Sequence, residues 1–400
     1  MSRAEAITDL EATVLDLICA DDLVGLAQDL IRAPGQNPPG QEMATAQVLA
    51  TGARERGLAV ESVEVAPGRP NLHITTPGAG SDPGLLLLGH TDVVPVGAGW
   101  TEDPFGARAD QGRLFGRGAT DMKGALAACL VAMGALHRAG APLSGPVELA
   151  ALMDEEQEGL GIRHYIADPQ RRQHAGCIVA EPTDLQTIVA ARGASYVEID
   201  IGGVAAHAGN PADGRNAIYG AAAVVAELER WHHGLAADAH QLVGPATWNV
   251  GVIAGGVGGS MVPAHCRISA DRRLLPGEDP QVVLAEVTRG LAALDLSDRG
   301  LNVAVRMPMS MPGFETAAAE PLVQVSDQAL VDAGGPGLAL GGWSAACDGG
   351  FLARDDGLPV VVLGPGSVTG QAHRPDESVA IADLITAART YALAALRLLS

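Results

Sequence analysis

The 400-residue sequence is poor in aromatic residues and in positive charge. Phe, Trp and Tyr make up 3% of a chain that is 47% hydrophobic, so Ala, Leu and Val must supply most of the core packing. Lys123 is the sole lysine, and 26 basic residues stand against 47 acidic ones, which gives a formal charge of -21. This acidity and the lack of any basic run argue against nucleic acids and anionic membranes as partners.

The sequence also lacks a long hydrophobic run, a secretory leader and a disulfide framework. Its longest apolar stretch, around Ala125 to Leu136, is shorter than the roughly 18 to 20 residues that a membrane-spanning helix needs. Residues 1–17 have neither a basic start nor a continuous apolar core, so we expect no signal peptide. The cysteines are odd in number and scattered, which is typical of reduced thiols: Cys19, Cys129, Cys177, Cys266 and Cys347. We therefore expect a soluble, cytoplasmic protein.

The first half of the chain has the alternating pattern of an α/β fold. Short apolar strands are predicted at Leu85 to Leu88, Val147 to Met153 and Cys177 to Ala180, and the Ala-rich segment Gly124 to Arg138 predicts a crossover helix. Such alternation indicates a sheet covered by helices on both faces. Because 400 residues exceed what one hydrophobic core usually holds, a second unit is expected.

A different rhythm between residues 192 and 306 predicts an inserted domain. The order there is β-α-β-β-α-β, which matches a small ferredoxin-like sandwich. Its predicted elements are strands at Tyr196–Ile201, Trp248–Ile253, Cys266–Leu274 and Leu301–Met307, and helices at Gly214–His232 and Pro280–Leu294. The α/β pattern then resumes with a strand at 358–363 and a closing helix at 381–399. We therefore predict a catalytic domain in two segments, 1–191 and 307–400, around an inserted domain, 192–306.

Metal-type side chains follow several predicted strands at the point where each strand ends. His90 and Asp92 come directly after Leu85 to Leu88, and alternate residues of an extended chain point the same way, so both can aim at one ion. Ligands of open α/β sheets bind beyond the carboxyl ends of strands, where this pair falls. A His-x-Asp pair alone is also common in proteins without a metal.

Acidic residues at two further places extend this set. Asp121 lies at the entrance of the predicted helix, where Asp is also typical of a helix cap, although one carboxylate can bridge two cations. Asp154, Glu155 and Glu156 directly follow a predicted strand. This pattern also fits a solvated acidic turn, but beside cations one Glu can bind metal while its neighbour stays free as a base.

Glu181 and His373 complete the candidate set. Glu181 follows the strand predicted at 177–180, and His373 follows the one at 358–363 and the run Gly364, Pro365, Gly366. Neither residue, taken by itself, indicates a metal site. From the residues alone we predict two metal ions, with these candidate ligands: His90, Asp92, Asp121, Glu156, Glu181 and His373.

Seven stretches of the sequence carry a resemblance to a known family. They are LLLLGHTDVVPVGAGWTEDPF, GRGATDMKGALA, MDEEQEGLG, VAEPTD, AHAGNPADGRNAI, DRRLLPGE and GPGSVTGQAHRPDE. In this order they resemble the M20 metallopeptidases and deacylases, nearest to the acetylornithine deacetylases and succinyl-diaminopimelate desuccinylases. The resemblance spans nearly the whole chain. It implies a zinc-exopeptidase-like mixed sheet flanked by helices, with an inserted ferredoxin-like α+β dimerisation domain.

The resemblance also implies a role for each metal-type residue. His90 and Glu181 would bind one Zn²⁺, Glu156 and His373 a second, and Asp121 would bridge the two, although Co²⁺ or Mn²⁺ suit the same ligands. Asp92 would orient His90 rather than bind metal, which revises the expectation from the residues alone. Glu155 would act as the general base and later as the general acid.

Three residues of the inserted domain are implied to contact the substrate. His207 would reach the active site of a partner subunit and polarise the scissile carbonyl, which would require a homodimer. Arg273 would bind a substrate carboxylate through paired hydrogen bonds, and Asn249 would be a further substrate contact. Without the resemblance, His207 could be a loop histidine, and Arg272 could be confused with Arg273.

The resemblance implies a hydrolase of linear amide bonds, and its substrate is open between two classes. We expect a di-zinc amidohydrolase that removes an acyl group from an N-acyl amino acid or related amine. A dipeptidase or carboxypeptidase with the same metals is the first alternative, and a catalytically silent acidic scaffold is the second. The desuccinylases carry Arg where Gly350 stands, which argues against a succinyl-diaminopimelate substrate.

Overall fold

The computed structural model describes residues 7–400, which form two compact units. The first unit comprises residues 7–189, 315–342 and 347–400, and the second comprises residues 190–314 and 343–346. Residues 1–6, on which the expectation of no signal peptide partly rests, lie outside the described residues. The domain boundaries expected at 191/192 and 306/307 stay a prediction.

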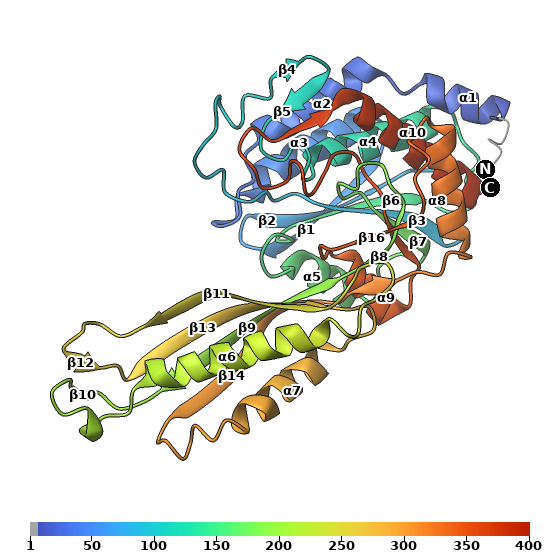
Figure 1. Cartoon of the computed structure of the whole chain (residues 1–400). Helices are drawn as coiled ribbons and strands as arrows, with labels where there is room; N and C mark the ends of the chain where they lie inside the picture. Colours follow the sequence, from blue (N-terminus) through green and yellow to red (C-terminus); the bar gives the residue numbers. More distant parts are fainter. Residues whose placement is uncertain (1–6) are drawn as a thin grey trace. The chain divides into compact units, whose positions relative to one another are not determined.

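A mixed sheet forms the centre of the first unit (Figure 1). Across residues 7–400 it has nine strands, in the order β1-β2-β6-β3-β7-β17-β8-β15 with β16 paired to β8. β3 runs parallel to β6 and β7, β17 runs parallel to β7, and β1 pairs antiparallel with β2. The strands are β1 (Ala59–Ala66), β2 (Arg69–Thr75), β3 (Gly84–His90), β6 (Val147–Leu152), β7 (His174–Val179), β8 (Ile188–Ala191), β15 (Phe314–Glu315), β16 (Gly341–Trp343) and β17 (Val360–Val362).

The central strands of this sheet are buried on both faces. Every residue of β3 and β6 is buried, which explains their continuous apolar runs in place of an alternating pattern. Because β3, β6, β7 and β17 are parallel, their carboxyl ends meet at one edge of the sheet. The residues that follow these four strands therefore lie close together.

Helices cover both faces of the sheet (Figure 1). α4 packs against α2 and α10 on one face, whereas α5 and α9 contact each other on the other face. Ala, Gly and other small residues let α4 lie buried between the sheet and the outer helices. The helices are α1 (Asp9–Asp16), α2 (Ala20–Arg32), α3 (Glu42–Glu55), α4 (Lys123–Arg138), α5 (Leu160–Ala167), α8 (Pro321–Asp332), α9 (Gly349–Asp356) and α10 (Ile381–Leu398).

A small sheet of β4 (Ala109–Asp110), β5 (Arg113–Phe115) and β18 (Ser378–Ala380) belongs to the same unit. β18 pairs antiparallel with β5. This pairing brings together two segments that are more than 260 residues apart in the chain, the one before Asp121 and the one after His373.

The second unit is an antiparallel sheet with two helices on one face. Its strands lie in the order β14-β9-β13-β11, so that the first strand stands between the fourth and the third, as in ferredoxin-like folds. The elements are β9 (Gly193–Gly202), α6 (Ala217–Leu235), β11 (Thr247–Gly255), β13 (His265–Leu274), α7 (Pro280–Ala292) and β14 (Asn302–Met311). Short strands β10 (Ala206–His207) and β12 (Met261–Val262) pair with each other, and a single 3-10 turn spans Pro211–Asp213. The α/β fold with a β-α-β-β-α-β insertion is as predicted.

Strands β9, β13 and β14 of the second unit alternate between a core face and an open face. Val197, Ile199 and Ile201 of β9 pack in the core beneath α6 and α7. Residues between them, such as Tyr196 and Glu198, point to the opposite face, because successive side chains of a strand alternate. The open face therefore presents polar and charged side chains.

Two expectations about the chain as a whole can be compared with the described residues. Within residues 7–400, no helix combines the length and hydropathy that crossing a membrane requires. The cysteines are free thiols, of which Cys19 is exposed and the other four are buried.

Candidate metal centre

The five predicted metal ligands converge at the carboxyl edge of the large sheet. His90 is the last residue of β3, and Glu181 follows the end of β7. The Nε2 atom of His90 lies 3.1 Å from Oδ1 of Asp121 and 3.3 Å from Oε1 of Glu181. Side chains from three segments thus surround one point, and all three are buried.

A second group of ligands forms beside the first. His373 comes from the loop between β17 and β18, and its Nε2 atom lies 3.1 Å from Oε2 of Glu156 and 3.3 Å from Oδ2 of Asp121. The two carboxylate oxygens of Asp121 therefore face two different imidazole rings, those of His90 and His373. This is the arrangement that a bridging carboxylate needs.

The donor atoms are close enough to hold metal ions. Two sets of three residues offer ligand atoms within 4.8 Å of one another: His90, Asp121 and Glu156, and His90, Glu155 and Glu181. Glu155, predicted as a base and not as a ligand, thus also stands beside the cluster. His373 itself has a left-handed backbone, with a φ of 63°, a conformation that costs a non-glycine residue free energy and that surrounding contacts must maintain.

The shifted pKa values of these side chains indicate that the cluster holds more negative than positive charge. Burial, together with the charge of Asp121, raises the pKa of Glu181 to about 7, and burial also raises the pKa of Glu156. Hydrogen bonds to Asp121 and Glu156 raise the pKa of His373 to about 10. Although burial lowers the pKa of His90, the neighbouring carboxylates Glu181 and Asp121 raise it well above its usual range. Divalent cations would supply this missing charge, so the residues fit metal ions well.

Asp92 contacts His90 and the backbone of Glu155 and Glu156. The Nδ1 atom of His90 lies 2.9 Å from the backbone oxygen of Asp92 and 3.5 Å from its carboxylate. That carboxylate accepts hydrogen bonds from the backbone N–H groups of Glu155 and Glu156, each at 3.2 Å. Asp92 is therefore in contact with the first predicted ligand and also with the turn that carries the predicted base.

Glu377 and Arg117 tie two ligand-bearing loops together, and the sequence did not single them out. Oε1 of Glu377 accepts from the backbone N–H groups of Thr120 and Asp121, at 2.9 and 3.0 Å. Oε2 accepts from Nη1 of Arg117 at 2.6 Å, and both side chains are buried. The sequence signal that could have identified them is a charged residue close to a predicted ligand: Glu377 lies four positions after His373, and Arg117 lies four positions before Asp121.

Lys123, two residues after the predicted ligand Asp121, is fully buried. Its ammonium group donates to the backbone oxygens of Ala33 and Pro34, and burial lowers its pKa to about 7. A Cβ atom at Gly118 would lie 2.8 Å from Cδ of Lys123, so the side chain occupies a tight channel. This packing leaves little room for a bulkier side chain beside the stem of Lys123.

The three predicted substrate contacts lie in the second unit. His207 is exposed in β10, and its Nδ1 accepts from the backbone N–H of Gly209 at 3.0 Å. Asn249 is exposed on β11, opposite Asp271 of β13. Arg273 shares the open face of the four-stranded sheet with Asn249 and pairs with Asp271 at 2.9 Å, whereas His207 lies in the separate β10–β12 pair. Their roles in binding and catalysis stay predictions.

The neighbouring Arg272 points the other way. It is 4% exposed, its guanidinium lies over the ring of Trp248, and it pairs with Glu278 at 2.7 Å. Its charge is therefore already matched inside the unit, which leaves Arg273 as the arginine of the two on the open face.

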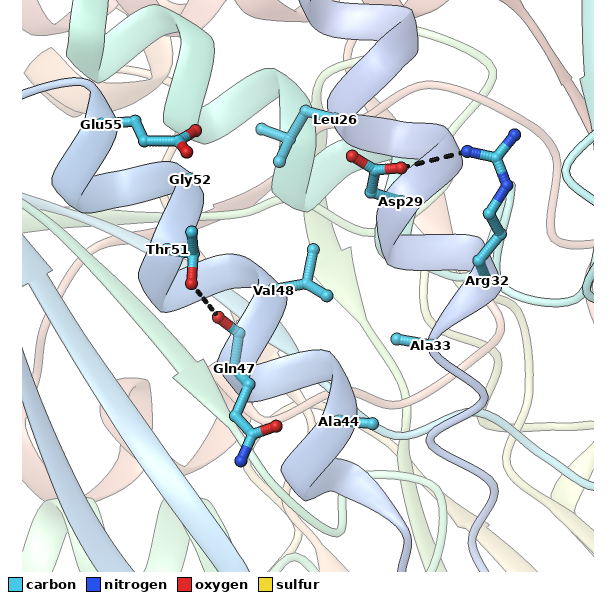
Figure 2. Close-up of a pocket in the computed structure, with 10 residues that line it drawn as sticks. All are labelled: Leu26, Asp29, Arg32, Ala33, Ala44, Gln47, Val48, Thr51, Gly52 and Glu55. Atoms are coloured by element: carbon cyan, nitrogen blue, oxygen red, sulfur yellow. Dashed lines mark hydrogen bonds and ion pairs between the residues drawn. The ribbon is translucent and has the colours of Figure 1, made fainter.

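The hollow between α2 and α3, shown in Figure 2, is separate from this cluster. It has a volume of about 550 Å³, and Asp29 and Arg32 form an ion pair at 3.0 Å beside it. Its lining contains none of the predicted ligands: Leu26, Asp29, Arg32, Ala33, Ala44, Gln47, Val48, Thr51, Gly52 and Glu55.

Comparison with protein families gives one match across most of the chain. Residues 86–397 match the model of peptidase family M20/M25/M40. The chain belongs to this family. The M20 family consists of metal-dependent hydrolases, so the convergence of His, Asp and Glu at one edge of the sheet agrees with the family's chemistry.

Curated relatives of this M20 chain include two acetylornithine deacetylases. The enzyme of Edwardsiella ictaluri is 32% identical over 354 residues, which cover 86% of this chain and 87% of the relative. The enzyme of Klebsiella pneumoniae is 33% identical over 342 residues, which cover 82% and 84%. The resemblance inferred from the seven sequence stretches is thereby confirmed.

Solved structures of M20 peptidases share the fold. The metallo-carboxypeptidase Sso-CP2 of Sulfolobus solfataricus has a TM-score of 0.78 at 20% identity, covering 95% of this chain and 100% of its own. The dipeptidase Dug1p of Saccharomyces cerevisiae has a TM-score of 0.78 at 14% identity, covering 98% and 99%. The YXEP protein of Bacillus subtilis, described as a dinuclear metal-binding M20 peptidase, has a TM-score of 0.72 at 16% identity, covering 95% and 98%.

Proposed function

We propose that this M20 hydrolase removes a short acyl group from an N-acyl amino acid or a related N-acyl amine. The products are a carboxylate and a free amine. One observation carries the proposal: Asp121 stands between His90 and His373, with one carboxylate oxygen toward each ring. This geometry supports a site for two metal ions, with Glu155 beside it.

Two Zn²⁺ ions per subunit are the proposed cofactors, with Co²⁺ or Mn²⁺ as alternatives. His90 and Glu181 would hold one ion and Glu156 and His373 the other, with Asp121 shared. When bound, such ions lower the pKa of a coordinated water to about 7 and polarise the scissile carbonyl. Mixed imidazole and carboxylate ligation suits all three metals.

Glu155 is the proposed base for this reaction. It accepts a proton from the attacking water, the oxygen of which bonds to the acyl carbon, and returns the proton to the nitrogen as the C–N bond breaks. Burial, together with the charges of Glu181, Asp348 and Glu156, raises the pKa of Glu155 well above its usual range, although His90 lowers it. General acid–base catalysis favours a carboxyl group whose pKa is raised from its ordinary value.

The proposed substrate carries a carboxylate. Arg273 on the open face of the second unit supports this, because its guanidinium stays partly exposed while paired with Asp271 of its own strand. The names of the curated relatives favour a deacetylase. Gly350, where desuccinylases have an arginine, argues against a succinyl-diaminopimelate substrate. A dipeptidase or carboxypeptidase remains the second candidate, which the family's peptidase members favour.

We further propose that the protein acts as a cytoplasmic homodimer. The edge strand β11 exposes Val252 and Ile253, and exposed apolar residues on an unpaired strand edge favour contact with a second copy. His207 would then complete the partner subunit's active site.

A substrate panel tests the proposed function. The Zn²⁺-loaded protein is incubated with N-acetyl, N-succinyl, N-formyl and N-carbamoyl amino acids and with dipeptides, and the free amine is measured. We expect the highest kcat/KM on an N-acyl amino acid. Faster hydrolysis of dipeptides would favour the peptidase, and no hydrolysis of any amide would refute both candidates.

A further inference from the structure

Asn37 is a buried residue with no role assigned so far, and it joins two carboxylates behind the metal centre. It lies between α2 and α3 and is 3% exposed. Its Nδ2 group donates to Oδ2 of Asp92 at 3.0 Å and to Oδ1 of Asp154 at 2.8 Å. Asp92 follows β3 and Asp154 follows β6, so one amide group links the ends of two neighbouring strands.

Both of these carboxylates hold the turn that carries Glu155 and Glu156. Asp92 accepts from the backbone N–H groups of these two residues. Asp154 accepts from the backbone N–H groups of Glu158 and Leu160, each at 3.3 Å, so the turn wraps around its side chain. Asp154 itself has a φ of 71°, a left-handed conformation that surrounding contacts must maintain in a non-glycine residue.

Asn37 is itself fixed in place. Its backbone N–H donates to the backbone oxygen of Val93 at 2.9 Å, which anchors it to the residue after Asp92 in the chain. Asp154 also accepts a hydrogen bond from Nη2 of Arg69 at 2.8 Å. Arg69 in turn forms an ion pair with the buried Glu42. The amide therefore meets the two carboxylates as part of a rigid polar network and not as a mobile side chain.

We propose that Asn37 is a positioning residue for amide hydrolysis, which fixes the turn that carries Glu155 by bridging Asp92 and Asp154. This inference rests on the proposed function. Two carboxylates that share one small, buried region repel each other, and the amide N–H groups between them offset that repulsion. Without the bridge, Asp92 or Asp154 must move, and the backbone of Glu155 and Glu156 moves with it.

Two substitutions separate this role from simple space filling. Asn37→Ala removes the bridge and leaves a small cavity, whereas Asn37→Asp keeps the size but places a third carboxyl group against the other two. Neither alanine nor aspartate supplies the two N–H groups that the amide offers to Asp92 and Asp154. We expect each variant to lower kcat about 10- to 100-fold, as is usual when a support of a metal-site residue is lost, with KM changed less than about threefold.

Asn71→Ala is the matched control. Asn71 is also a fully buried asparagine with two hydrogen bonds, one from the backbone N–H of Met153 at 3.1 Å and one to the backbone oxygen of Gly161 at 2.9 Å. Both of these hydrogen bonds go to backbone atoms of Met153 and Gly161 and not to the carboxylates of Asp92 and Asp154. Its loss should destabilise the protein to thermal unfolding without a comparable loss of kcat.

Hydrogen–deuterium exchange gives a readout that needs no substrate. The backbone N–H groups of Glu155 and Glu156 should exchange faster in Asn37→Ala than in the parent protein, in the metal-loaded state. This measurement decides the role of Asn37 in the turn even if the parent protein hydrolyses no amide and the proposed function fails.

The outcomes divide clearly. A lowered kcat in both Asn37 variants, with nearly unchanged KM and faster exchange at Glu155 and Glu156, supports the positioning role. Equal losses of kcat in Asn37→Ala and Asn71→Ala, an unimpaired Asn37→Asp, or unchanged exchange would overturn it. If the alanine variant does not fold, the aspartate variant decides by the same measurements.

Discussion

The surroundings of single residues at the proposed metal centre account for their proposed roles. Asp121 could have been a helix cap, yet its two oxygens face His90 and His373. Glu155 and Glu156 are adjacent in sequence, but Glu156 contacts His373, whereas Glu155 stands on the side of His90 and Glu181. Neighbouring carboxylates can therefore serve as ligand and base.

Replacement of Glu155 tests this division of roles. Glu155→Gln removes the base but no proposed ligand, so the protein should keep its metal content and lose turnover by about 100-fold or more. Metal content by atomic emission and kcat on the best substrate of the panel give the two readings. Glu158→Gln, an exposed change in the same turn, should leave both unchanged. A Glu155→Gln enzyme with normal kcat would refute the role as base.

Arg273 makes a separate prediction about substrate binding. Arg273→Ala should raise KM for substrates with a free carboxylate by about 10- to 100-fold with little change in kcat, because a charged hydrogen-bonded pair contributes about 1.5 to 3 kcal/mol. Arg267→Ala is the control, since Arg267 lies on the same strand and face and pairs with Asp200 at 2.8 Å. The same KM in the parent and the Arg273 variant would contradict the assignment.

At the scale of elements, the parallel strands fix which residues can meet. β3, β6, β7 and β17 end at one edge of the sheet, and the predicted ligands follow three of these strands at short range. Asp121 and His373 depend on longer loops. The buried pair of Arg117 and Glu377 joins these loops, through the backbone N–H of Asp121.

Breaking this pair should loosen metal binding. Glu377→Gln leaves the buried guanidinium of Arg117 without its counter-charge, so we expect about 10- to 100-fold weaker Zn²⁺ binding by calorimetry. Glu148→Gln is the control, because Glu148 is also a buried acid in this unit but pairs with His73 and His174, away from the proposed ligands. Equal Zn²⁺ affinity in the parent and Glu377→Gln would contradict this role.

The sequence predicts those elements whose pattern is local. Continuous apolar runs identified β3 and β6, and the Ala-rich segment identified α4 to within a residue. Alternation and turn residues identified the strands of the second unit. The pairing of β18 with β5 was missed, because two or three residues of strand carry no periodicity of their own.

The supports of the centre were missed for a related reason. Asn37, Arg117 and Glu377 bond to residues 55 to 260 positions away. No spacing rule in a single sequence connects partners that far apart. The candidate ligands could be singled out in the sequence because each follows a recognisable strand or lies in a motif that resembles the family.

At the scale of the whole molecule, the chain divides its proposed functions between two units. The metal-type residues all belong to the first unit, and His207, Asn249 and Arg273 belong to the second. The proposed roles of these residues require both units, and the proposed homodimer further requires two chains.

Mixed dimers test the proposed exchange of His207 between subunits. His207→Ala and Glu155→Gln should each be nearly inactive alone. When subunits of the two variants are exchanged, one site of the mixed dimer combines an intact Glu155 with an intact His207, so part of the activity should return. Activity that stays lost after verified subunit exchange, or a His207→Ala enzyme with normal kcat, would argue against a role across the interface.

A crystal structure of the Zn²⁺-loaded protein, with anomalous diffraction recorded at the zinc edge, tests the metal centre most directly. We expect two anomalous peaks on either side of Asp121, one beside His90 and Glu181 and the other beside Glu156 and His373. No peak at this edge of the sheet, or a single peak that leaves Asp121 bound to one ion only, would contradict the two-metal centre.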